Sequence, residues 1–191
     1  MKKYYLFLSI AIMIVSSGCG KDNSNDNNKS NDNNISITKE STHEDMGMDH
    51  SGSGEVPDTL KVAENPTYKV GSNAIIKTDH MQGMKNAEAT IVGAYDTVAY
   101  SLSYTQTTDG KRIEDHKWVI QEELKNAGDK VLDPGSEAII EADHMQGMKG
   151  ATGVIDSAKR TTVYMIDYTP TTGGERVTNH KWVTDSELSA K

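Results

Sequence analysis

An internal repeat constrains this chain more than any other feature of its sequence. When the chain is shifted by 64 residues, residues 71–124 align on residues 135–188 without a gap, and 29 of the 54 aligned positions are identical. Each copy spans about 55–60 residues, a length at which a domain without disulfides is only marginally stable. The repeat therefore predicts two small domains, residues 66–127 and 128–191, and their size favours packing against each other.

The hydrophobic pattern within each copy is typical of β-strands. Val98, Tyr100, Leu102 and Tyr104 alternate along the first copy, and Tyr164, Ile166 and Tyr168 do so along the second. Hairpin signals follow at Asp109-Gly110 and Gly173-Gly174, and the acidic segments 122–124 and 187–188 suit one helical turn. We expect an all-β fold of two tandem, small SH3-like barrels, with these tyrosines in the core.

The first 20 residues have the pattern of a secretory signal. Lys2 and Lys3 precede an apolar run from Tyr4 to Val15, too short to span a bilayer, and Ser-Ser-Gly-Cys19 follows. This tetrapeptide resembles the lipobox of bacterial lipoproteins, in which the cysteine is acylated. The prediction is a signal peptide over residues 1–18 and a lipidated Cys19 that holds the protein on the outer face of the cell membrane.

A polar tether, residues 19–65, is predicted to follow Cys19. Residues 20–42 are mainly Asn, Asp, Ser and Lys, a composition that buries too little apolar area to offset its ordering entropy. Within the tether, a short cluster contains His43, Met46, Met48 and His50. Thioethers and imidazoles are copper ligands, and thioether sulfur selects Cu(I). A copper site is the favoured interpretation, with zinc or nickel binding and a chance cluster as alternatives.

The most strongly preserved parts of the repeat also carry histidine and methionine. The heptapeptide D-H-M-Q-G-M-K occurs at residues 79–85 and 143–149, and H-K-W-V occurs at residues 116–119 and 180–183. The candidate metal ligands are His80, Met81, Met84, His116, His144, Met145, Met148 and His180. Asp79 is a candidate for orienting His80 by a hydrogen bond.

These residues also have a purely structural interpretation. Methionine fills irregular gaps in cores, and a histidine can simply donate a hydrogen bond to a backbone carbonyl. Trp118 and Trp182 are expected to be core residues in either case.

The charge and the missing motifs exclude several functions. A net charge of −8 and a pI near 5.2 oppose binding to nucleic acid. The sequence has no P-loop, no G-x-S-x-G, no G-x-G-x-x-G and no H-E-x-x-H. We therefore expect a binding protein and not an enzyme.

The lipobox, the polar tether and the doubled module together resemble the YdhK/CopL-type lipoproteins of Gram-positive bacteria. The resemblance covers residues 66–191 and the N-terminal anchor. It implies a surface-exposed, lipid-anchored protein that binds copper outside the membrane and contributes to copper tolerance, with a copper exporter or the cell wall as a further partner. The alternatives are a tandem SH3-like module that binds the cell wall or a protein partner, and a cuprous oxidase.

Overall fold

The computed structural model describes residues 51–191, which form one antiparallel sheet and two short 3₁₀ turns. The strands are β1 (Lys61–Val62), β2 (Asn73–Ile76), β3 (Glu88–Thr105), β4 (Arg112–Ile120), β5 (Glu137–Ile139), β6 (Thr152–Tyr168), β7 (Val177–Thr184) and β8 (Leu188–Ala190). The turns are η1 (Gln121–Glu123) and η2 (Asp185–Glu187). The predicted all-β fold and the two helical turns are confirmed. The predicted signal peptide, Cys19 and the His43–His50 cluster lie outside the described residues.

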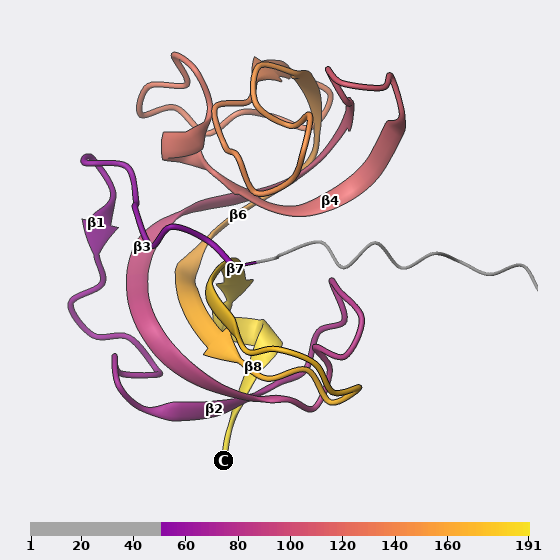
Figure 1. The fold of residues 1–191 in the computed structure, drawn as a ribbon. Helices are drawn as coiled ribbons and strands as arrows, with labels where there is room; N and C mark the ends of the chain where they lie inside the picture. The colour runs from indigo at the N-terminus through magenta and orange to yellow at the C-terminus, as the bar shows by residue number, and fades with distance from the viewer. Residues whose placement is uncertain (1–50) are drawn as a thin grey trace, which may run out of the picture. The chain divides into compact units, whose positions relative to one another are not determined.

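Two long strands, β3 and β6, join the two repeats. They pair antiparallel from Ala89↔Tyr168 to Tyr104↔Gly153. Strands β1, β2 and β4 pair with β3, while β5 and β7 pair with β6, and β8 closes against β2. Figure 1 shows β3 and β6 as long curved ribbons that run through both halves of the fold. The repeats therefore share one eight-stranded sheet.

Each of two hydrophobic cores combines the first half of one repeat with the second half of the other. One core joins apolar residues between Ala74 and Ala94 to those between Tyr164 and Leu188. The other joins residues between Val98 and Leu124 to those between Ile140 and Ile155. Antiparallel pairing of β3 with β6 produces this exchange, because it places the start of one strand beside the end of the other. Neither 66–127 nor 128–191 contains a complete core.

The expected core aromatic residues lie inside these clusters. Tyr100, Tyr104, Tyr164 and Tyr168 are all buried, as their alternation along the strands predicted. Trp182 is also buried, in a third cluster with Leu60, Ile120 and Met165, and Trp118 packs against that cluster. Alternation of large side chains on one face of a strand is thus a reliable guide to the core of this protein.

The chain segment 51–65 departs from the predicted tether. Leu60 and Ala63 are buried, and Val56 packs against the third core cluster. The segment is also fastened to β7, because Gly52 N–H donates to Thr178 O over 2.8 Å. Residues 51–65 therefore belong to the folded part of the chain. A few apolar side chains in this otherwise polar segment are enough to pack it against the core. Among residues 51–191, no helix is long and apolar enough to cross a bilayer.

Candidate metal centre

The repeated heptapeptide forms a tight turn between two strands in each repeat. Met84 N–H donates to Met81 O over 3.2 Å, and Gly83 adopts a φ of +76°, which favours glycine. A Cβ on Gly83 would lie 2.5 Å from Thr172 Oγ1, in the β6–β7 connection of the other repeat. Gly147 has the same role in the second copy, with a φ of +73° and Thr108 Oγ1 at 2.6 Å from a Cβ. The glycine thus lets each motif turn dock on the opposite repeat.

The second histidine of each repeat lies on a strand with an irregular register. His116 on β4 faces Leu102, and His180 on β7 faces Ile166, with register shifts on both sides of each pair. Asp115 and Asn179 precede these histidines and have positive φ angles of 47° and 52°. A β-bulge redirects the side chains of a strand, and both bulges occur where a histidine reaches the same cavity.

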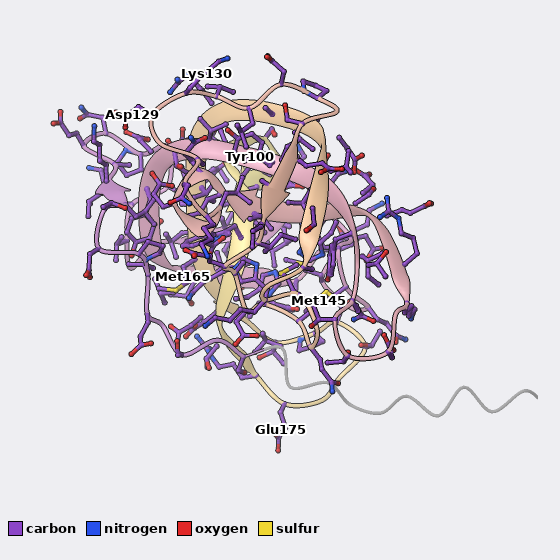
Figure 2. All side chains as sticks on the ribbon, turned by 90° about the horizontal axis from the view of Figure 1, so that it is seen from above. Tyr100, Asp129, Lys130, Met145, Met165 and Glu175 are labelled. Atoms are coloured by element: carbon purple, nitrogen blue, oxygen red, sulfur yellow. The ribbon has the colours of Figure 1, made fainter. Side chains whose placement is uncertain are left out.

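A cavity of about 1040 Å³ brings the motif residues of both repeats together. Its walls include all four repeat histidines, His80, His116, His144 and His180, and two methionines, Met81 and Met145. Figure 2 shows Met145 among the packed side chains, whereas Glu175 projects from the β6–β7 connection. Ser51 also lines this cavity, and it follows His50 directly in the chain. Six of the eight ligands predicted in the repeats therefore share one space.

The charges on the cavity wall favour a cation. Seven carboxylate side chains line it, against three lysines. A cleft lined by an excess of one charge concentrates ions of the opposite sign. The carboxylates are those of Glu55, Asp79, Glu114, Asp115, Glu123, Glu141 and Asp143.

The structure does not bring the other two predicted methionines to the cavity. Met84 and Met148 are fully buried, one in each of the first two cores, where they pack among aliphatic and tyrosine side chains. Met81 and Met145 remain partly exposed. The two methionines of each motif thus have different surroundings, although the sequence offers no distinction between them.

Two glutamates, the buried Glu123 and the partly buried Glu187, hold the first histidine of each repeat. His80 Nε2 lies 2.7 Å from Glu187 Oε1, and Trp118 Nε1 donates to Glu187 Oε2 over 2.8 Å. The second repeat mirrors this arrangement. His144 Nε2 lies 2.8 Å from Glu123 Oε1, and Trp182 Nε1 donates to Glu123. Each glutamate therefore forms hydrogen bonds with the histidine and the tryptophan of the opposite repeat.

These contacts correct one prediction about His80. The acceptor that orients the His80 ring is Glu187 and not Asp79. Glu187 lies 107 residues further along the chain, and its Oε1 forms the hydrogen bond with His80 Nε2. Asp79 is exposed on the cavity wall instead. Glu123 and Glu187 are identical in the repeat alignment, and this identity is the sequence feature that could have indicated a role for both glutamates.

Several ring nitrogens in the cavity wall have no hydrogen-bond partner. Nδ1 of His80, Nδ1 of His144 and Nε2 of His116 are buried and make no hydrogen bond. Burial lowers the pKa of His116 to about 4, and the nearby His144 and His80 lower it as well. His116 is therefore neutral at pH 7, and a neutral imidazole offers one nitrogen lone pair to a metal ion.

The described residues contain no complete site of histidines and acids alone. Within residues 51–191, no group of three or more His, Cys, Asp or Glu side chains is placed to hold one ion. Met81 and Met145 also line the cavity, and their thioethers are candidates for additional donors. Mixed imidazole and thioether donors suit copper better than calcium or magnesium.

Comparison with known proteins places both repeats in one family. The model of the family described as "Protein of unknown function (DUF1541)" matches residues 70–121 and 134–185. The chain belongs to the DUF1541 family. The match confirms the two tandem repeats, and it follows the repeat boundaries and not the exchanged cores.

One of the relatives of this DUF1541 chain matches it over its whole length. It is 58% identical to "Uncharacterized protein YdhK" of Bacillus subtilis strain 168, over all of this chain and 91% of the relative. A crystal structure of the B. subtilis ydhK protein has a TM-score of 0.73 and 66% identity, covering 76% of this chain and 99% of that one. A solution structure of the ydhK C-terminal domain has a TM-score of 0.62 and 68% identity, covering 64% and 93%.

Proposed function

We propose that this DUF1541 protein binds Cu(I) in the cavity between its two repeats and sequesters it outside the cytoplasmic membrane. The observation that carries the proposal is the set of buried ring nitrogens without hydrogen-bond partners on His80, His116 and His144. Buried polar atoms are almost always satisfied, so a repeated set of unsatisfied nitrogens in one cavity wall points to a ligand that they hold.

The donor set favours copper over harder cations. Imidazole binds copper in both oxidation states, whereas a thioether selects Cu(I). Met81 and Met145 lie in the cavity wall beside the histidines. The acidic wall attracts the ion, and the partly buried thioethers and imidazoles then retain it.

The extracytoplasmic location belongs to the same proposal. It rests on the lysine-flanked apolar run and on Ser-Ser-Gly-Cys19, which together suit a lipidated anchor. A surface lipoprotein with this cavity would bind copper before the ion reaches the membrane and so contribute to copper tolerance. The proposal includes no catalytic step, and the copper ion is cargo.

A competition titration with a chromogenic Cu(I) chelator tests the proposal. We expect the mature chain to take up Cu(I), and the fourfold variant H80A/H116A/H144A/H180A to lose the uptake that the cavity provides. A matched variant, H43A/M46A/M48A/H50A, removes only the tether cluster and should retain that uptake. Loss of all uptake in the tether variant would place the copper on residues 43–50 and leave the repeats with a structural or wall-binding role.

A further inference from the structure

Glu123 and Glu187 lie in equivalent positions, at the ends of η1 and η2. Their side chains are largely buried, with 7% and 15% of their surface exposed. Neither was a predicted ligand, and each contacts a histidine of the opposite repeat. A buried carboxylate beside a candidate metal ligand acts on that ligand through the hydrogen bond between them.

The hydrogen bonds of Glu187 determine where the proton of His80 lies. Glu187 Oε2 accepts three donors, Trp118 Nε1 over 2.8 Å, Thr184 N–H over 2.8 Å and Thr184 Oγ1 over 2.9 Å. Three hydrogen bonds to one oxygen favour the ionised form of a carboxylate. The carboxylate is therefore ionised and can only accept.

An acceptor at Oε1 requires a donor on His80. His80 Nε2 lies 2.7 Å from this oxygen, so the neutral ring carries its proton on Nε2. Its Nδ1 then has a lone pair, and this atom is the one that is buried without a hydrogen-bond partner. The lone pair is available to a metal ion.

The second repeat gives the same result independently. Glu123 Oε2 accepts Ile120 N–H over 3.1 Å and Trp182 Nε1 over 3.1 Å, and the same indole N–H lies 3.2 Å from Oε1. Glu123 Oε1 faces His144 Nε2 at 2.8 Å, and His144 Nδ1 is buried without a hydrogen-bond partner. The tautomer with the proton on Nε2 is thus imposed twice, by residues from different parts of the sequence.

We propose that Glu187 and Glu123 are positioning residues that fix the tautomers of His80 and His144, so that Nδ1 of each ring binds the metal ion. The glutamate of each repeat then sets the tautomer of the histidine ligand in the other repeat. This inference rests on the proposed function, because it names the ligating atoms of the same cavity.

A single substitution, Glu187→Gln, inverts the predicted tautomer. The three donors at Oε2 require the amide oxygen of Gln at that place, so the amide NH₂ group takes the place of Oε1. It would donate to His80 Nε2 and move the ring proton to Nδ1, which removes the lone pair from the cavity. Glu123→Gln should do the same to His144 alone.

The experiment measures side-chain ¹⁵N shifts of histidine by NMR in the metal-free full chain, at a pH where the rings are neutral. In the wild type we expect His80 and His144 protonated on Nε2. In E187Q only His80 should change, and in E123Q only His144. The control is E122Q, because Glu122 accepts from Thr97 Oγ1 and lines a different cavity from the histidines; it should leave both tautomers unchanged.

Cu(I) competition on the same proteins gives the second readout. Loss of a residue that orients a metal ligand costs about 10–100-fold in affinity, so E187Q and E123Q should each bind at least about 10-fold more weakly than E122Q. A wild-type His80 protonated on Nδ1 would overturn the inference. So would an E187Q variant with a switched tautomer and unchanged Cu(I) affinity, although copper binding itself would stand.

Failure of the proposed function would have a different signature. In that case the wild type would bind no Cu(I), which removes the ligand assignment, while the NMR result would still report whether the glutamates set the tautomers. If E187Q does not fold, E123Q and the wild-type spectrum still decide the assignment.

Discussion

At the scale of single residues, the two methionines of each motif separate a packing role from a binding role. Met81 is partly exposed in the cavity wall and packs against the outside of the first core, whereas Met84 is fully buried inside that core. The sequence predicted both as ligands, because a thioether is both an apolar filler and a soft donor. Only the path of the turn decides which of the two faces the cavity, and that path depends on contacts with the other repeat.

Alanine substitutions at these positions should have opposite effects. Met84→Ala removes a fully buried side chain and should lower the free energy of unfolding by about 2–5 kcal/mol. Met81→Ala should cost much less stability and instead weaken Cu(I) binding. Chemical denaturation and Cu(I) competition on both variants measure this. A loss of affinity in a stably folded Met84→Ala, with none in Met81→Ala, would reverse the assignment.

The pKa values of two partly buried groups, His116 and Glu187, predict a loss of stability in acid. The pKa of His116 is lowered from 6.5 to about 4, so the unfolded chain binds a proton more readily and stability falls as pH drops from about 6.5 to 4. The pKa of Glu187 is lowered from 4.5 to about 2, so its contribution is present above pH 4.5 and disappears as pH falls towards 2.

Denaturation of the metal-free protein between pH 7 and pH 3 measures this dependence. His116 should account for up to about 3 kcal/mol of the change between pH 6.5 and 4. The variant His116→Asn, which does not titrate there, should have a flatter profile in that window. An identical slope in both proteins would show that His116 keeps its ordinary pKa in the folded chain.

At the scale of elements, the contact between a motif turn and the opposite hairpin holds the cavity wall in place. Thr171 N–H donates to Gly83 O over 2.9 Å, and Thr107 N–H donates to Gly147 O over 2.9 Å. The strands, their turns and the repeated motif could be predicted from short-range patterns. These contacts could not, because they join residues far apart in the chain and leave no local periodicity.

Substituting Gly83 tests this docking contact. Gly83→Ala places a Cβ at a φ of +76° and only 2.5 Å from Thr172 Oγ1. Gly110 has a similar φ of +73° with nothing within 4 Å of a Cβ, so Gly110→Ala measures the backbone cost alone, about 1–2 kcal/mol. We expect Gly83→Ala to be clearly more destabilising in thermal and chemical denaturation. Equal costs would mean that the turn does not depend on close approach.

At the scale of the whole molecule, the exchanged cores make the two repeats one folding unit. The sequence predicted two domains because it repeats, and the family match follows the same repeats. The exchange could not be predicted from hydrophobic pattern, since each strand has the same alternation whether its partners come from its own repeat or from the other. The contacts of Glu123 and Glu187 with the opposite repeat could not be predicted for the same reason.

A single repeat should therefore not fold as a monomer. Residues 51–127 contain the first half of one core and the second half of the other, so two copies could restore both cores by pairing their long strands. We expect this fragment to be either unfolded or a dimer in light scattering and circular dichroism. A monomeric fragment with native β-structure would show that the exchange is not needed for folding.

We propose that copper is bound between the repeats by histidines from both of them. A crystal structure of the Cu(I)-loaded protein, with anomalous diffraction measured at the copper edge, tests it most directly. We expect an anomalous peak in the cavity within bonding distance of Nδ1 of His80 and of Nδ1 of His144, with His116, Met81 or Met145 as further ligands. Copper bound only at residues 43–50, or no copper in the cavity at saturation, would contradict it.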